Sequence, residues 1–276
     1  MRKLSIIILL SLLSLTSCNL PLVKSTPNTD VVATRVAQTL SAQPSATLQP
    51  TQEVLPTIEL TTPPPTATLT VTSTPTTSPG DPKLTLGSPN FQDTFNGGNA
   101  FGLQGSPYED DAVRISMQSG AINFTSLAIN AGKRWRLTSP QPRNFYLEGT
   151  FKTINCSGYD HFGLVMRAPS YSDGIGYYFG VSCNGQYIFQ RWDGSGTSTV
   201  IGWASDPNIK TGPNQTNRIG VKAVDDTFKL YVNGYLVKEF TDSGLTAKGH
   251  FGAYVTALEN SNFTVDLEEL LEWNLP

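Results

Sequence analysis

The chain has 276 residues and a formal net charge of −3, from 19 Lys and Arg against 22 Asp and Glu. Only 15% of the residues are charged and no Lys/Arg cluster stands out, so the sequence lacks the positive face that nucleic-acid binding needs. The two His and three Cys residues form no set at the spacing of a closed structural zinc site. These numbers argue against a nucleic-acid partner and a structural zinc ion.

The N-terminal residues have the pattern of an export signal. Arg2 and Lys3 precede an apolar stretch over 4–15, which is shorter than the roughly 20 residues that span a membrane. This pattern predicts a signal peptide over 1–17. The Leu-Thr-Ser-Cys sequence ending at Cys18 resembles the bacterial lipoprotein box, which implies a diacylated Cys18, cleavage before it and an anchor in the cell membrane outside the cytoplasm. The alternative is an ordinary signal peptide followed by an incidental cysteine.

Residues 18–82 have the composition of a linker. They are rich in Thr and Pro, and no aromatic residue lies between Asn19 and Pro82. Such a segment cannot bury enough apolar surface to offset the entropy of ordering it. We therefore expect a lipid-anchored, disordered Thr/Pro-rich stalk that holds the remaining domain away from the membrane.

Residues 83–276 have the signals of one β-domain. Apolar and polar residues alternate with period two, and turn dipeptides recur between these runs. Two hairpins are predicted, one with Asn184-Gly185 and one with Asn233-Gly234 at the turn. The predicted strands are 121–124, 145–155, 162–167, 177–183, 186–192, 218–224, 228–232, 235–240, 250–255 and 263–271. This spacing favours an all-β, two-sheet antiparallel sandwich or jelly roll.

Burial and crosslinking follow from the same pattern. The residues expected in the core are Phe151, Leu164, Met166, Val181, Ile188, Leu230, Val232, Phe251 and Val265. Cys156 and Cys183 each end a predicted strand in a chain expected to leave the cytoplasm, which favours a disulfide between them. A reactive thiol pair or a metal pair is the alternative, and no His/Cys cluster at ligand spacing supports it.

The order of motifs over 90–273 resembles a known family. Phe91-Gln-Asp-Thr-Phe95, Phe162-Gly-Leu-Val-Met-Arg167 and Leu230-Tyr-Val-Asn-Gly234 are similar to the concanavalin A-like lectin and glucanase jelly roll, and to its laminin-G-like and keto-disaccharide-hydrolase-like branch. The resemblance implies this sandwich fold in a surface protein that binds or cleaves glycans. It does not choose between these activities, since one fold supports many functions.

Carboxylate pairs for glycoside hydrolysis are not evident. Glucanases of this fold carry Glu-x-Asp-x-x-Glu on one strand, whereas the acidic runs here are Asp266–Glu272 and Glu109–Asp111, with other spacings. We therefore expect no catalytic residue. His161 and His250 are far apart in sequence and no Gly-x-Ser-x-Gly elbow accompanies them, so a structural role is favoured.

Sugar binding requires an aromatic platform with polar partners. The candidate ligand-binding residues are Trp192, Arg191, Asp193, Arg167, Tyr177 and Asp160, with Tyr171 and Trp203 as further aromatic candidates. Rim packing of the sandwich is the alternative for Trp192 and Trp203, and Trp135 and Trp273 are interpreted as packing residues. Calcium is a candidate cofactor with weak support, because Asp173, Asp206 and Asp225-Asp226 lie in turn-rich stretches without a calcium-loop motif.

Three hypotheses remain open. The first is a surface lipoprotein whose sandwich binds a glycan or another extracellular ligand. The second is a glycoside hydrolase of the keto-disaccharide-hydrolase-like type. The third is a structural or adhesive spacer without a small ligand.

Overall fold

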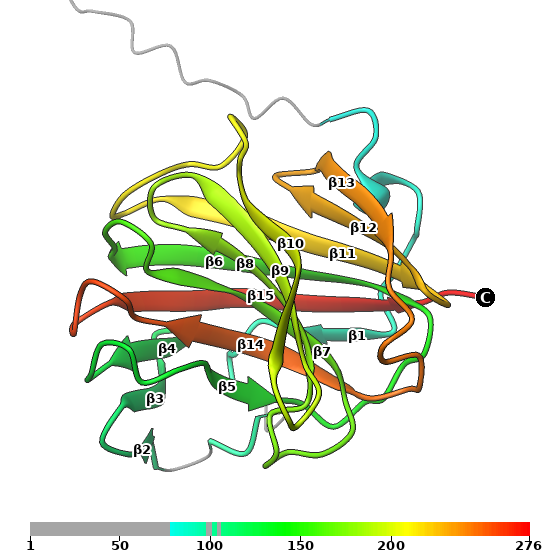
Figure 1. Ribbon diagram of the computed structural model, residues 1–276. Coiled ribbons are helices and arrows are strands. Elements are labelled where there is room, and N and C mark those ends of the chain that lie inside the picture. The colour runs from blue at the N-terminus through cyan, green and yellow to red at the C-terminus, as the bar shows by residue number, and fades with distance from the viewer. Residues whose placement is uncertain (1–77, 98–100, 104–105) are drawn as a thin grey trace, which may run out of the picture. The chain divides into compact units, whose positions relative to one another are not determined.

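The computed structural model describes residues 78–97, 101–103 and 106–276. Over these residues the chain forms two antiparallel sheets packed face to face, with one short 3-10 helix, η1 (Pro82–Leu84), near the start (Figure 1). The described part contains no helix with the length and hydropathy needed to cross a bilayer. The predicted signal peptide, Cys18 and the linker up to residue 77 lie outside the described residues.

The larger sheet has nine strands over the described residues. Its order is β13 (Tyr235–Thr241), β12 (Thr227–Val232), β11 (Thr216–Val224), β6 (Phe145–Asn155), β15 (Thr264–Asn274), β4 (Ala121–Ser126), β3 (Val113–Gln118) and β2 (Tyr108–Glu109), and β1 (Phe91–Asp93) pairs with β15. The long strands β6 and β15 lie together at the centre, where each has a neighbour on both sides.

The smaller sheet has six strands over the same part of the chain. Its order is β10 (Thr197–Ser205), β9 (Gln186–Trp192), β8 (Gly176–Ser182), β7 (His161–Ala168), β14 (His250–Thr256) and β5 (Arg134–Leu137). The two edge strands, β10 and β5, were not predicted from the sequence. β10 pairs with β9 through two register shifts, and β5 has only four residues, so neither shows a clean alternating pattern.

The core lies between the two sheets and follows the alternation. On β7, for example, Phe162, Leu164 and Met166 belong to the main buried cluster, while the intervening Val165 belongs to a separate cluster on the outer face. All nine residues expected in the core are buried. Ile188 is buried on the outer side of β9, because its neighbours Tyr187 and Phe189 are the residues that enter the main cluster.

The two predicted hairpins form with different turns. Asn233 and Gly234 have φ values of 52° and 84°, as a type I′ turn requires at both central positions. At the other turn only Gly185 has a positive φ, of 89°. Both hairpins therefore exist, but the Asn-Gly pair dictates the type I′ geometry only in the β12–β13 turn.

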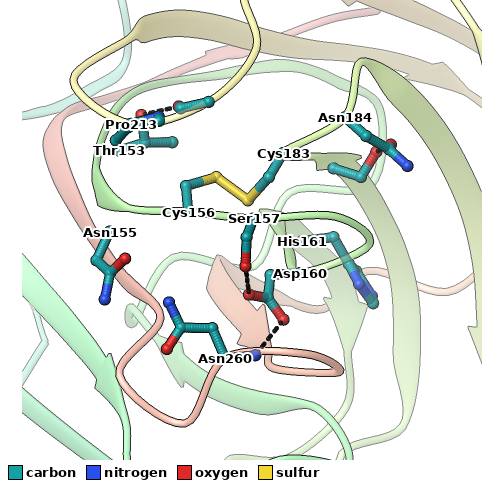
Figure 2. Close-up of a disulfide and its surroundings, with 12 residues drawn as sticks. Thr153, Asn155, Cys156, Ser157, Asp160, His161, Cys183, Asn184, Pro213 and Asn260 are labelled. Atoms are coloured by element: carbon teal, nitrogen blue, oxygen red, sulfur yellow. Dashed lines mark hydrogen bonds between the residues drawn. A yellow bond between two sulfur atoms is a disulfide. The ribbon is translucent and has the colours of Figure 1, made fainter. Parts of the chain in front are cut away.

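The predicted disulfide between Cys156 and Cys183 is confirmed, with the two Cα atoms 5.5 Å apart (Figure 2). It joins the connection after β6 to the turn after β8. The adjacent Asp160 is buried, and its Oδ1 accepts hydrogen bonds from the backbone N–H groups of Leu258 and Glu259 at 2.7 and 2.8 Å. The disulfide and the Asp160 carboxylate together link the β6–β7, β8–β9 and β14–β15 connections at one end of the sandwich.

Candidate functional site

The outer face of the six-stranded sheet carries aromatic side chains that the main core does not use. Tyr178 of β8 and Tyr254 of β14 form an outer cluster with Leu137, Val165 and Ala168, and Trp135 and Trp192 pack against it. Trp135 comes from β5 and Trp192 from β9, so strands at both sides of the sheet contribute to this face. Both tryptophans remain half-buried, which leaves part of each indole open to a ligand.

A pocket of about 340 Å³ lies between these rings. It is lined by Gly132, Lys133, Trp135, Asp173, Gly174, Tyr178, Trp192 and Thr197. Three aromatic walls with one cation and one carboxylate combine apolar surface with a few polar groups, which is the usual composition of a small-ligand site. We call this the Trp135–Trp192 pocket.

The connection between β7 and β8 holds the walls of this pocket in place. The indole Nε1 of Trp135 donates to the carbonyl of Tyr171 at 3.3 Å, and that of Trp192 donates to the carbonyl of Asp173 at 3.2 Å. The hydroxyl of Tyr178 donates to the carbonyl of Gly174 at 2.5 Å. Each ring is therefore fixed by its polar end, so little side-chain entropy remains to be lost when a ligand stacks on it.

Gly174 permits the close approach of this connection to Trp135. It has a φ of 69°, and a Cβ atom there would lie 2.8 Å from the Cη2 of the indole. Any other residue would push the tryptophan or the loop away, so the pocket depends on glycine at this position.

Lys133 brings a positive charge into the pocket. Its Nζ lies 5.1 Å from the centroid of the Tyr178 ring, and burial lowers the pKa of the ammonium group. Burial also raises the pKa of the Tyr178 hydroxyl, with the nearby Asp173 charge acting in the same direction.

Trp135 is shared with two further hollows. One, of about 320 Å³, is lined by Phe101, Gly102, Trp135, Arg136, Leu137 and Tyr171, and the other, of about 330 Å³, by Tyr108, Asp110, Val113, Arg134, Trp135, Arg136, Tyr171 and Ser172. These two hollows and the Trp135–Trp192 pocket meet at the Trp135 side chain on the edge strand β5. We call the three together the β5 groove.

The structure separates the residues that the sequence grouped into one ligand site. Trp192 lines the pocket and Asp193 follows it in an exposed turn. Hydrogen bonds from the Ser195 hydroxyl and from the backbone N–H groups of Ser195 and Gly196 lower the pKa of Asp193 to about 2. Of the six residues grouped as one ligand site, these two lie at or beside the groove.

Arg191 and Tyr177 lie on the other side of their strands. The Nη1 of Arg191 contacts Oδ1 of Asp242 at 2.5 Å, and the same carboxylate accepts a hydrogen bond from the Tyr177 hydroxyl. Burial and this hydrogen bond raise the pKa of Tyr177 to about 12. Successive residues on a strand face opposite sides, so Arg191 cannot share a surface with Trp192.

Arg167 and Asp160 are buried and bonded to the protein itself. The Arg167 guanidinium donates to the backbone carbonyls of Leu245, Arg143 and Asp225, and lies 5.0 Å from the Phe228 ring centroid. Only 2% of Arg167 and none of Asp160 is exposed to solvent. Their hydrogen bonds give both residues a structural role.

The other aromatic candidates lie at two places on this sheet. Tyr171 lines two hollows of the β5 groove, and its ring lies 4.2 Å from that of His250. Trp203 lies away from the groove, with its ring 5.4 Å from Tyr159 and 5.2 Å from His161. Trp135, interpreted from the sequence as a packing residue, is the central side chain of the groove.

The acidic run Asp266–Glu272 belongs to the nine-stranded sheet, and Asp110 of the other run lines the β5 groove. Asp266 accepts a hydrogen bond from Asn123 at 2.7 Å, and Glu269 contacts Lys83 and Gln92 at 3.4 and 3.1 Å. Within the described residues no three His, Cys, Asp or Glu side chains converge as a metal site. Asp173, Asp206, Asp225 and Asp226, the candidate calcium ligands, each bond to groups in their own surroundings.

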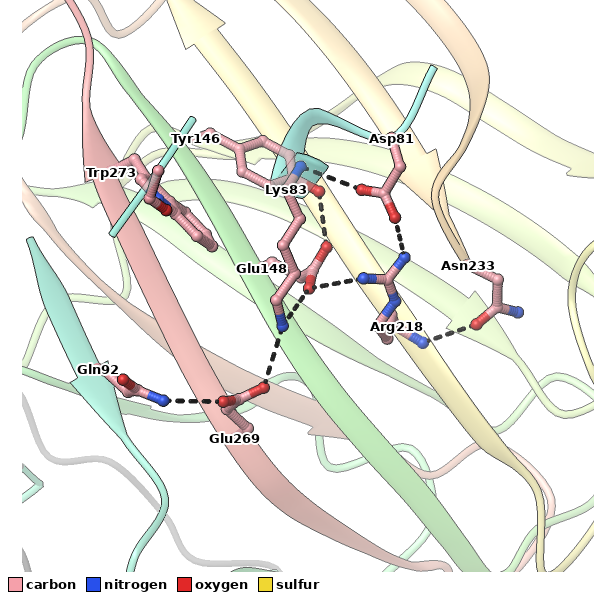
Figure 3. A network of polar contacts seen from close by, with 10 residues as sticks. Asp81, Lys83, Gln92, Tyr146, Glu148, Arg218, Asn233, Glu269 and Trp273 are labelled. Atoms are coloured by element: carbon pink, nitrogen blue, oxygen red, sulfur yellow. Dashed lines mark hydrogen bonds and ion pairs between the residues drawn. The ribbon is translucent and has the colours of Figure 1, made fainter. Parts of the chain in front are cut away.

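A second polar network covers the outer face of that larger sheet. Glu148 of β6 is buried, contacts Arg218 at 3.3 Å and Lys83 at 3.5 Å, and accepts a hydrogen bond from the Tyr146 hydroxyl at 2.8 Å (Figure 3). Burial raises the pKa of Glu148, and the charge of Arg218 opposes this shift. The N-terminal segment supplies Asp81 and Lys83 to the network and covers this part of the face.

Comparison with known proteins identifies the fold. No protein-family model and no curated protein match the chain. Among solved structures, a Bacillus subtilis protein of unknown function with a galectin-like fold matches with a TM-score of 0.51 and 10% identity, over 68% of this chain and 96% of that one. The chain has the concanavalin A-like jelly-roll fold.

Two further solved structures have lower scores. A carbohydrate-binding module from Bacillus subtilis matches with a TM-score of 0.42 and 21% identity, over 55% of this chain and 83% of that one. A Bacillus licheniformis beta-glucanase matches with a TM-score of 0.49 and 11% identity, over 69% and 99% of the two chains.

Proposed function

We propose that this protein is a glycan-binding surface lipoprotein, in which the sandwich binds sugar through the β5 groove and the Thr/Pro-rich stalk connects it to a lipid at Cys18. The observation that carries the binding function is the Trp135–Trp192 pocket, with its hydrogen-bonded aromatic walls and its Lys133 and Asp173 side chains. A sugar ring can stack on an indole through its C–H face while its hydroxyls bond to the charged groups at the margin.

Binding is favoured over glycoside hydrolysis by the placement of the carboxylates. The β5 groove contains two carboxylates over the described part of the chain, but Asp173 and Asp110 line different hollows and do not face each other within one of them. Hydrolysis needs two carboxyl groups on opposite sides of one glycosidic bond. The half-exposed aromatic rings also favour binding over an inert spacer, whose sheet surface would carry no such platform.

A glycan-binding assay tests the function. The full chain should bind at least one polysaccharide or oligosaccharide in an immobilised panel, and Trp135→Ala or Trp192→Ala should weaken that binding about tenfold or more, as loss of an aromatic anchor does. Trp203→Ala removes a half-buried tryptophan from the same sheet outside the groove, so it should leave the affinity unchanged.

Two results would contradict the proposal. One is an absence of saccharide binding by the folded wild-type chain, and the other is an equal loss of affinity in all three tryptophan variants. Release of new reducing ends from a bound glycan would favour the hydrolase instead.

A further inference from the structure

Three basic residues flank Trp135 on the edge strand of the smaller sheet. Lys133 lies directly before β5, and Arg134 and Arg136 belong to it. The two arginines alternate with Trp135 and face the other side of β5, but β5 is an edge strand, and Trp135 and both arginines line one hollow at this edge. All three line the β5 groove, in a chain whose net charge is −3. Over the described residues, the ion pairs of the structure include none of these three cations.

Rings and carbonyl groups hold two of these cations, Lys133 and Arg136. The Lys133 ammonium lies against the Tyr178 ring. Arg136 donates to the carbonyls of Phe101 and Gly102 at 2.8 and 3.2 Å and lies 5.6 Å from the Tyr108 ring centroid. The Nε of Arg134 is buried and has no hydrogen-bond partner in the described structure. Positive charge is therefore concentrated in a partly desolvated groove, where an anion would be bound most strongly.

The carboxylates that line the groove are already bonded. Asp110 accepts hydrogen bonds from the Tyr108 hydroxyl and from the backbone N–H groups of Ala112 and Val113, at 2.8 to 2.9 Å. Asp173 accepts one from the backbone N–H of Ile175 at 2.9 Å. Two bonded carboxylates against three cations leave the groove with a positive balance.

We infer that the β5 groove selects acidic sugars: a carboxylate or sulfate group is bound by Lys133 while the sugar ring stacks on Trp135 or Trp192, and Arg134 and Arg136 add positive charge at the edge of β5. This inference rests on the proposed glycan-binding function. Charge-assisted hydrogen bonds from ammonium and guanidinium groups suit both anions, and a neutral sugar would leave the Lys133 charge unpaired in its pocket.

Matched ligands test the charge preference. Calorimetry on the full chain would compare oligogalacturonate, the same oligomer with its carboxyl groups reduced to alcohols, and a sulfated galactan oligomer. We expect at least one of the acidic ligands to bind about tenfold or more tightly than the reduced oligomer, with an advantage that shrinks as salt is raised. The uronate and sulfate samples distinguish the two sources of the anion.

Substitutions assign the preference to the groove. Lys133→Gln should remove most of the preference for the acidic oligomers, and Lys133→Arg should keep that preference. Lys229→Gln changes a lysine that pairs with Glu239 on the larger sheet, so it should leave the preference unchanged. Circular dichroism would verify that each variant is folded.

The outcomes separate this inference from the function on which it rests. Equal binding of acidic and reduced oligomers, with both weakened by Trp135→Ala, would overturn the charge preference and leave glycan binding standing. A preference that survives Lys133→Gln, or is lost equally in Lys229→Gln, would also overturn it. Binding of no saccharide at all would overturn both.

Discussion

Single side chains on the outer face of the smaller sheet are held by aromatic neighbours. His161 is buried, its Nδ1 lies 3.0 Å from the carbonyl of Tyr159, and its ring meets those of Trp203 and Tyr254 edge to face. Burial lowers the pKa of His161 to about 4. Between pH 6.5 and 4 the unfolded chain therefore binds a proton at this residue that the folded chain does not, and acid favours unfolding.

Substitution of His161 should reduce the sensitivity to acid. Between pH 7 and pH 4.5, His161 should lower the free energy of unfolding of the wild type by about 2 kcal/mol. His161→Gln lacks this titrating group, so its free energy of unfolding, measured in urea, should fall by about 2 kcal/mol less than that of the wild type. Burial raises the pKa of Glu272 to about 7, so this residue makes the folded state more stable as the pH falls from 7. The contribution of Glu272 is the same in wild type and variant. Equal losses in wild type and variant would show that His161 is not held neutral by burial.

At the scale of elements, a short N-terminal segment is fixed to the larger sheet. Asp81 is buried, caps η1 through the backbone N–H of Lys83 at 3.1 Å and pairs with Arg218 of β11 (Figure 3). Leu86 packs on the outer aromatic cluster of that sheet, and the Trp273 indole donates to the carbonyl of Gly87 at 3.0 Å. This segment therefore belongs structurally to the sandwich. The domain begins at or before Asp81, and not at residue 83 as the composition predicts.

Removing the charge of Asp81 should destabilise the domain. Asp81→Asn keeps the size of the side chain and a capping oxygen but loses the ion pair with Arg218, whose remaining partner is Glu148. We expect a loss of about 2 kcal/mol in urea unfolding, because the carboxylate is buried. Glu239→Gln, which breaks the exposed pair with Lys229, should change stability by less than about 1 kcal/mol. Equal effects would contradict the burial argument.

The whole molecule has two different outer faces. The N-terminal segment and its ion pairs lie on the middle strands of the nine-stranded sheet, whereas the six-stranded sheet carries the open aromatic groove. This asymmetry suits a domain that presents one face to a ligand. In the proposed arrangement, the stalk leads from this domain to a lipid at Cys18.

The anchor predicts a defined labelling result. In cells that take up a clickable palmitate analogue, the wild-type chain should be labelled and Cys18→Ala should not, because the lipid is attached to the Cys18 sulfur. Ser25→Ala, a substitution in the expected stalk, should label like the wild type. Labelling of Cys18→Ala, or release of the wild type from membranes by high salt alone, would contradict lipid anchoring.

Local chemistry in the sequence determined much of the architecture. The Asn233-Gly234 pair and the alternation around it predict a hairpin, because only certain residues accept positive φ and because strand side chains alternate between faces. The central strands β6, β7 and β14 and the disulfide between Cys156 and Cys183 follow from the same kind of reasoning. These features depend on residues close together in sequence or on one crosslink between exported cysteines.

The residues that line the candidate site are determined by the order of the strands in the sheet and by the face of the sheet to which each side chain points. Trp192 and Arg191 are adjacent in sequence and lie on opposite sides of β9, so a cluster in the sequence is not a cluster on the surface. Trp135 and Lys133 join Trp192 only because β5 and β9 belong to one sheet and the β7–β8 connection bonds to both indoles. Contacts between distant segments carry no local signal, so tertiary structure alone reveals this pocket.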